Sequence, residues 1–205
     1  MKSLSTGAVL AAGAELVREH GWNALSMRTV ATRLGVTPMA LYRHVPNADS
    51  LSSGVLSFIA EPIAEVTRSG DAFTDLEAWA RRTHAALVPY PGAAAALLVR
   101  WFETSPALRA VDALLQSMHD EGVEGFEAVA AVNAVFMFAL MRAQGEQSVR
   151  DAGVVKRTLH TAAVAYPLPR LTALAEHYTT ARFDLHFDYG LRVLLDGIAA
   201  RKAAS

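Results

Sequence analysis

Residues 37–44, TPMALYRH, bring together side chains that can contact double-stranded DNA. Arg43 can reach a phosphate or the edge of a guanine, and Met39 can touch the methyl group of a thymine. Tyr42 and His44 can donate hydrogen bonds to phosphate oxygens. Arg28, in the preceding segment, can also reach a base edge. The predicted DNA contacts are Arg28, Thr37, Pro38, Met39, Tyr42, Arg43, His44 and Asn47.

Two short helices joined by a tight turn would present these side chains, and residues 27–46 predict that arrangement. Ser26 is a suitable N-cap for the first helix, because its hydroxyl can accept a hydrogen bond from an unpaired backbone N–H. Gly35 can adopt the left-handed conformation that ends a helix. Thr37 offers a second N-cap, and Pro38 suits the next position, where its missing N–H costs nothing. The pattern predicts a helix-turn-helix, whose second helix, here Thr37–His44, lies in the DNA major groove.

Residues 5–51 resemble the N-terminal domain of the tetracycline-repressor (TetR) family of bacterial transcription regulators. The matching segments are AGAELVREHGWNALSMRTVATRLGV and LYRHVPNADSL, and the family marks within them are Gly21, Gly35, Tyr42, His44 and Leu51. The resemblance implies a homodimer that binds a palindromic double-stranded DNA operator. It also implies that a small-molecule effector releases the operator.

One position departs from the family pattern. The family commonly has a lysine that contacts phosphate at the start of the fourth helix, whereas this sequence has Ala48, between Asn47 and Asp49. The N-terminus of that helix still attracts phosphate through its free N–H groups. Losing one phosphate contact is expected to lower operator affinity and to reduce the salt slope by about one unit. A helical small-molecule-binding protein with weak or lost DNA binding is therefore the alternative prediction.

The remainder of the sequence predicts an all-α protein. Segments with apolar residues at helical spacing are 47–66, 75–88, 93–102, 105–121, 128–141, 154–165, 171–179 and 182–200, with a break at Pro62. The sequence contains no alternation long enough for a strand. We predict an N-terminal three-helix DNA-binding domain with a helix-turn-helix over residues 1–46, and a larger C-terminal helical ligand-binding and dimerisation domain over residues 47–205.

Residues 128–141, AVAAVNAVFMFALM, are the most apolar stretch of the chain. A membrane-spanning helix needs about 20 apolar residues, and Asn133 interrupts this stretch. A helix that is apolar on nearly all sides is expected to pack within its subunit and against a partner. The last segment, FDYGLRVLLDGIAA, resembles the C-terminal helix of the tetracycline-repressor-like branch, in which these two helices form a four-helix bundle across the dimer. The predicted dimer interface is Phe126, Phe187, Gly190, Leu191 and Leu194.

A pocket between helices of the C-terminal domain is the predicted small-molecule site. Aromatic and Met side chains predominate there, with His84, Arg100, His119 and Asn133 as polar groups, so an apolar or aromatic effector is expected. The tetracycline repressor uses a His on its fourth helix to bind its magnesium-chelated drug. Ala64 stands in that register here, so the sequence predicts no metal or other cofactor and does not favour tetracycline. The predicted ligand contacts are Phe58, Trp79, His84, Trp101, Phe102, Met118, Asn133, Phe136 and Met137.

Composition and motifs argue against several other classes of protein. The chain has no cysteine, which excludes disulfides and thiolate metal sites. The histidines lack metal-ligand spacing, and no serine elbow, Gly-rich phosphate loop or paired carboxylate is present. A helical enzyme is thus the weaker alternative, and no enzymatic activity is predicted. Because the N-terminus lacks a signal-peptide pattern, the predicted protein is a cytoplasmic, ligand-responsive transcriptional regulator, most simply a repressor.

Overall fold

The computed structural model describes residues 4–148, 161, 166, 168–173, 177 and 183–202. Within these residues the chain is helical and contains no strand, which confirms the all-α prediction. The predicted helix 154–165 lies almost entirely outside the described residues. Of the predicted helix 171–179, the structure describes α10 (Pro169–Ala173) and residue 177.

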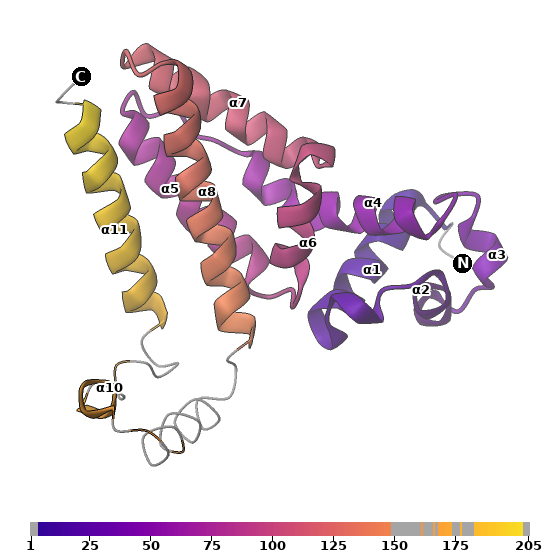
Figure 1. Ribbon diagram of the computed structural model, residues 1–205. Helices are drawn as coiled ribbons and strands as arrows, with labels where there is room; N and C mark the ends of the chain where they lie inside the picture. The colour runs from indigo at the N-terminus through magenta and orange to yellow at the C-terminus, as the bar shows by residue number, and fades with distance from the viewer. Residues whose placement is uncertain are drawn as a thin grey trace.

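The helices divide between a small end and a larger body, with α4 running from one into the other (Figure 1). The small end holds α1 (Thr6–His20), η1 (Trp22–Ala24), α2 (Met27–Leu34), α3 (Pro38–Leu41) and α4 (Ala48–Ala60). The body holds η2 (Glu61–Ala64), α5 (Ala72–Leu87), α6 (Ala93–Arg100), η3 (Trp101–Glu103), α7 (Ser105–Asp120), α8 (Gly125–Ser148) and α11 (Phe183–Lys202).

The turn that was predicted around Gly35 is present. Ser26 Oγ accepts from the Thr29 N–H at 3.1 Å, and Thr29 Oγ1 accepts from the Ser26 N–H at 3.0 Å, so α2 begins with a reciprocal capping box. Gly35 ends α2 with φ 66°, in the left-handed region that favours glycine. The prediction for the second helix needs correction, because the Thr37 hydroxyl makes no capping hydrogen bond and α3 ends at Leu41.

Other helix boundaries follow local capping. The helix of residue 47 onward breaks at Pro62 as predicted, since α4 ends at Ala60 and η2 follows it. The next helix starts earlier than the predicted residue 75. Asp71 Oδ1 accepts from the Thr74 N–H at 2.8 Å and thereby starts α5 at Ala72.

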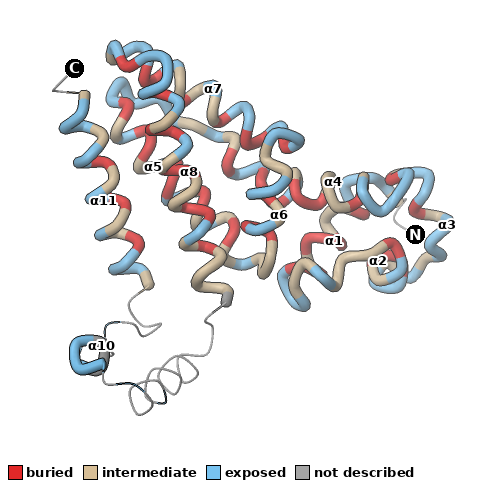
Figure 2. Tube along the Cα trace, viewed as in Figure 1, coloured by how far each residue is buried: buried red, intermediate tan, exposed pale blue. Residues whose placement is uncertain are grey.

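α8 is the central helix of the body and packs against α5, α6, α7 and α11. Figure 2 shows buried residues along the sides of α5, α7 and α8 that face one another. At the C-terminal end of α8, Gln147 Nε2 donates to the Leu87 carbonyl at 2.7 Å and to the Tyr90 carbonyl at 3.0 Å. The Leu87 carbonyl also accepts from the Tyr90 N–H at 2.9 Å, and the Tyr90 carbonyl from the Ala93 N–H at 3.0 Å, so Gln147 adds a second donor to each. The end of α5 is therefore held against α8 by hydrogen bonds from Gln147 as well as by apolar packing.

A buried carboxylate joins the start of α5 to the end of α7. Asp75 Oδ1 accepts from the Ser69 N–H and hydroxyl, both at 2.8 Å, and Asp75 Oδ2 accepts from the Ser117 hydroxyl at 2.7 Å. Burial raises the pKa of the Asp75 carboxyl, but the three hydrogen bonds, with Arg68 nearby, outweigh it and the pKa is lowered.

Asp75→Asn should lower the free energy of unfolding at pH 7 by about 1 kcal/mol, because an amide cannot accept on both sides. A pKa that is depressed in the folded state stabilises the protein above the unfolded value, about 3.9, and that contribution disappears as pH falls through the folded value. Urea denaturation should therefore show a constant gap between the two proteins down to about pH 5 and a shrinking gap below about pH 4. A gap that is independent of pH would contradict this assignment.

Candidate DNA-binding surface and effector site

The helix-turn-helix presents the predicted DNA contacts at the free end of the molecule. Val30, Ala31, Leu41 and Val45 are buried and fix α2 and α3 to the core. Figure 2 shows α3 exposed at the end of the molecule opposite α11. The predicted contacts that lie exposed are Arg28, Thr37, Pro38, Met39, Tyr42, Arg43 and Asn47, and His44 is half-buried.

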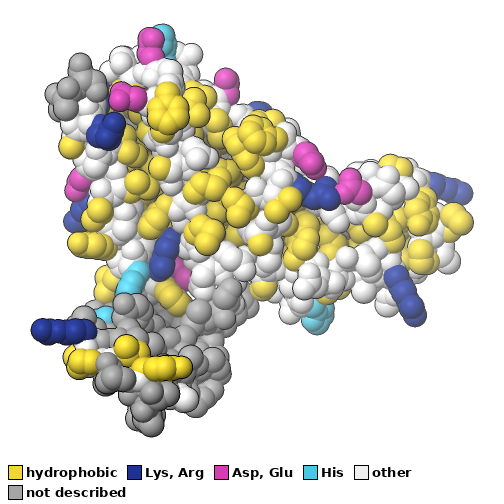
Figure 3. Space-filling model, in the orientation of Figure 1, with side chains coloured by type: hydrophobic (Ala, Val, Ile, Leu, Met, Phe, Trp, Pro, Cys, Tyr) yellow, Lys and Arg dark blue, Asp and Glu magenta, His cyan; other side chains and the backbone are white. Residues whose placement is uncertain are grey.

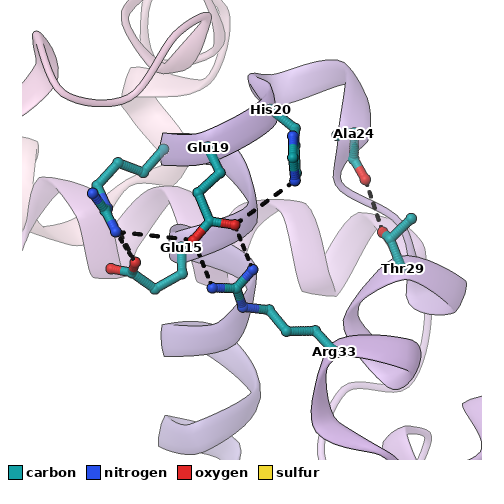
Figure 4. A network of polar contacts seen from close by, with 7 residues as sticks. Glu15, Glu19, His20, Ala24, Thr29 and Arg33 are labelled. Carbon is teal, nitrogen blue, oxygen red and sulfur yellow. Dashed lines mark hydrogen bonds and ion pairs between the residues drawn. The ribbon is translucent and has the colours of Figure 1, made fainter.

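The arginines of this end have different roles. Arg28 and Arg43 form no ion pair with any residue that the structure describes, which leaves both guanidinium groups accessible to a ligand. Arg33 instead holds Glu19 of α1 in a two-pronged contact, with Nη1–Oε2 at 2.7 Å and Nη2–Oε1 at 2.8 Å (Figure 4). The hydrogen bond from Arg33 lowers the pKa of the Glu19 carboxyl. Arg33 therefore fixes the angle between α1 and α2.

The N-terminus of α4 carries its own cap. Asn47 Oδ1 accepts from the Ser50 N–H at 2.7 Å, which leaves the amide nitrogen of Asn47 facing outward with donors to offer. Ala48 follows and contributes no charge. Phosphate binding at this helix end therefore depends on backbone N–H groups and on the Asn47 amide.

Arg100, at the end of α6, bridges the body to α4. Its Nη2 lies 2.5 Å from Asp49 Oδ1, and its Nη1 donates to Ser53 Oγ at 3.0 Å. A further contact of 3.3 Å reaches Glu103 of η3. Arg100 was predicted as a polar group of the pocket, but its guanidinium instead contacts residues of α4 and η3.

An aromatic cluster lies directly beside this bridge. The rings of Trp79 and Phe136 stack with centroids 5.2 Å apart, and Trp101 meets Phe136 edge-on at 5.9 Å. Trp79 Nε1 donates to the Ile63 carbonyl at 3.0 Å, so its orientation is fixed. Because Trp101 follows Arg100 in the chain, the cluster and the bridge share one short segment. Three predicted ligand contacts, Trp79, Trp101 and Phe136, therefore form one cluster, and the exposed Phe102 ring lies against Trp101 at its edge.

Other predicted ligand contacts lie elsewhere. His84 Nε2 lies 2.9 Å from Glu146 Oε1, and its ring stacks on Phe187 at 4.3 Å. Asn133 is exposed on α8 and Phe102 is 71% exposed, so neither lies in an enclosed pocket, although the Phe102 ring contacts Trp101 at 3.7 Å.

Phe58 lines a separate open crevice between the end of α4, η2 and the end of α5. Met118 is buried in the core, and Met137 is half-buried on α8. The predicted ligand set is thus distributed over several places, because composition identifies aromatic residues without showing which face each occupies.

The predicted dimer interface also needs correction. Phe187 and Leu191 are 4% and 1% exposed, since they pack against their own subunit. A Cβ on Gly190 would lie 2.7 Å from Phe138 Cζ, so this glycine serves the contact of α11 with α8 of the same chain. Phe126 is 85% exposed and remains available to a partner, and Leu194 is half-buried.

Exposed apolar side chains offer a better candidate for that interface. They are Phe126, Val129 and Met141 on α8, and Leu185, Tyr189 and Val193 on α11. A groove of about 290 Å³ between the two helices runs beside Phe126, Ala130 and Ile198. Figure 3 shows hydrophobic side chains gathered over α7 and α8 on the visible face. The helices predicted for dimerisation therefore have an apolar outer surface, which includes the predicted Phe126 but otherwise consists of residues that were not predicted.

Two further properties bear on the class of protein. Residues Gly125–Gln147 of α8 are long and apolar enough to cross a membrane by length and composition, but the helix packs against α5, α6, α7 and α11 as a core helix does. Among the residues that the structure describes, no group of three or more His, Asp or Glu side chains could hold a metal ion.

Comparisons with known proteins cover nearly the whole chain. Residues 9–51 match the family described as bacterial regulatory proteins, tetR family, and residues 67–202 match the tetracyclin repressor-like C-terminal domain. The class A tetracycline repressor of transposon 1721 from Escherichia coli is 30% identical over 206 residues, covering 98% of this chain and 94% of the relative.

Solved structures agree with these matches. A possible TetR family regulator from Streptomyces coelicolor A3(2) superposes with a TM-score of 0.83 and 26% identity, covering 96% of this chain and 99% of that one. The Streptomyces coelicolor protein ActR in complex with actinorhodin superposes with a TM-score of 0.81 and 22% identity, over 98% and 97% of the two chains.

Proposed function

Because the chain belongs to the tetR family of bacterial regulatory proteins, we propose that it is a cytoplasmic repressor that binds a palindromic operator as a homodimer. The family consists of ligand-responsive transcriptional regulators rather than enzymes. In this proposal α2 and α3 read the operator, and a largely apolar or aromatic effector releases it.

One observation supports this proposal above the others: the aromatic cluster and the bridge to α4 are consecutive in the chain. Trp101 contacts Phe136 in the body, while Arg100 contacts Asp49 and Ser53 at the end of α4 nearest to the DNA contacts. An effector that displaces the Trp101 ring would move Arg100 relative to α4. A second link runs between the Trp22 N–H, after α1, and the Pro91 carbonyl, before α6, at 2.8 Å.

The free energy that the effector must supply to release the operator can be estimated. Two recognition helices of a dimer must lie about one helical turn of DNA apart, roughly 34 Å. To change a population of 1:99 into 99:1, the effector must favour the released geometry by about 5.5 kcal/mol. A flat aromatic ligand could supply this free energy through its own buried surface, since burial of apolar area contributes about 25 cal/mol per Å².

The proposal also names the chemical class of the effector. Ala64 provides no imidazole for a metal-chelated drug. The cluster of Trp79, Trp101 and Phe136 favours a planar aromatic molecule. The neighbour ActR was crystallised with actinorhodin, which is consistent with an aromatic effector for this fold.

Selection from a random pool of double-stranded DNA tests the proposed function directly. The full-length protein should enrich a palindrome whose half-sites lie about one helical turn apart. Enrichment of no sequence, at a salt concentration where non-specific binding is suppressed, would instead favour a helical ligand-binding protein without operator recognition.

Ala48→Lys should strengthen operator binding about fivefold in moderate salt, because it adds one cation beside the N-terminus of α4. The slope of log affinity against log salt concentration should become steeper by about one unit. Fluorescence anisotropy across a salt series measures both quantities. Ala48→Gln is the matched control, since it adds length without charge, and an equal gain from Gln would contradict a phosphate contact at this position.

A further inference from the structure

Thr83, on α5, is a buried polar residue without a hydrogen bond. Its side chain is 0% exposed, and Oγ1 has no partner within the part of the chain that the structure describes. Among the residues that the structure describes, the other fully buried polar residues are Asp75, Thr104 and Ser117, and each of them is hydrogen-bonded. Arg142, which is half-buried, also has a buried Nε without a hydrogen bond, although its Nη2 donates to the Phe183 carbonyl. A buried hydroxyl without a partner is unfavourable, because folding removes its hydrogen bonds to water and no hydrogen bond within the protein replaces them.

The Thr83 hydroxyl also lacks the hydrogen bond that threonines in helices usually make. A threonine in a helix commonly donates to the carbonyl four residues earlier. Thr32 in α2 does so to the Arg28 carbonyl at 3.0 Å, and Thr104, between η3 and α7, donates to the Arg100 carbonyl at 2.9 Å. Thr83 differs from both, so its orphaned hydroxyl is a property of this site rather than of threonines in this protein.

The contacts of two neighbours on α5 indicate which part of α8 Thr83 faces. Trp79, one turn earlier on α5, stacks on Phe136 of α8, while His84 contacts Glu146 further along α8. Thr83 therefore faces the stretch of α8 between 136 and 146. The fully buried residues of that stretch include Ala139, Leu140 and Ala143, whose side chains offer neither donor nor acceptor. Arg142, in the same stretch, has a buried Nε, but Thr83 Oγ1 makes no hydrogen bond with it.

We infer that the Thr83 hydroxyl is the hydrogen-bond partner of the effector, and that the effector is a planar aromatic molecule bearing a hydroxyl or carbonyl group. The inference rests on the proposed function, in which the effector enters the cluster of Trp79, Trp101 and Phe136. The ligand supplies the missing partner, so binding removes an unfavourable feature of the effector-free chain. This makes Thr83 a specificity-determining residue, since an aromatic molecule without a polar group leaves the hydroxyl unpaired.

Two probes of the same shape test the inference. 2-Naphthol and 2-methylnaphthalene differ in one hydrogen-bonding group, and their dissociation constants can be measured by calorimetry and by quenching of tryptophan fluorescence. Thr83→Val removes the hydroxyl at nearly constant volume and should reduce the preference for 2-naphthol about tenfold. Thr83→Ala, which removes the hydroxyl without adding a methyl group, should reduce the preference similarly.

Thr104→Val is the matched control, because it removes a buried hydroxyl that already has a partner. It should lower the melting temperature and leave the preference between the probes unchanged, whereas Thr83→Val should not lower the melting temperature. If both probes bind and the preference survives both Thr83 variants, the inference is wrong while the aromatic site stands. If neither probe binds the wild-type protein, the assignment of the aromatic cluster as the effector site is wrong, and so is the role inferred for Thr83.

Discussion

Arg43→Ala should weaken operator binding by about 10- to 100-fold. Arg43 is exposed just after α3 and forms no ion pair with the described part of the chain, so its guanidinium can contact a guanine edge or a phosphate. A bidentate contact to guanine contributes about 1–3 kcal/mol, which is the origin of the expected range. Fluorescence anisotropy with a labelled operator duplex at fixed salt concentration measures the effect.

The same titrations separate the two kinds of contact. If Arg43 reads a base, its loss relaxes specificity at one operator position. If it binds phosphate, all sequences weaken equally and the salt slope falls by about one unit. Arg192→Ala, an exposed arginine of α11 in the body, is the control and should leave binding unchanged. Equal affinity of the Arg43 variant and the wild type would remove α3 from the DNA interface.

The fold of the helix-turn-helix could be predicted from sequence because its signals are local. Ser26 and Gly35 act within one or two turns of their own position, and the structure has the cap and the left-handed turn where the sequence predicts them. The length of α3 could not be predicted in this way. Residues 42–44 keep helical spacing in the sequence, but they form a turn that leads into α4.

The site residues of the body were harder to predict, because the spacing of apolar residues does not show which side of each helix faces the effector site and which faces a partner subunit. α8 is apolar on nearly every side, so the sequence could not separate Phe136, which is buried, from Asn133, which is exposed. On α11 the predicted interface residues Phe187 and Leu191 lie on the inner face, and Tyr189 lies on the outer one. The role of Arg100 depends on Asp49, far away in the chain, and no spacing rule connects the two residues.

Arg100→Glu should lower operator affinity in the absence of effector by about 30-fold. The substitution removes the attraction between Arg100 and Asp49 and replaces it with repulsion, and each of these two changes is worth about 1 kcal/mol near the surface. The pair with Glu103 lies within one short segment and does not join α6 to α4. Together these changes amount to roughly 2 kcal/mol against the geometry in which α6 holds α4. The residual response to effector should shrink as well, because the released geometry is already favoured.

The matched control is Arg82→Glu, since Arg82 pairs with Glu65 at 2.6 Å at similar exposure but lies wholly within the body. It should leave operator affinity unchanged. Asp49→Arg should rescue Arg100→Glu by restoring an opposite-charge pair. The added cation also attracts DNA, so the substitution must be measured with and without Arg100→Glu. Only the difference between the two effects reports the bridge. Additive effects would mean that Arg100 and Asp49 act independently, and the route from the aromatic cluster to α4 would then have to run through the Trp22–Pro91 contact instead.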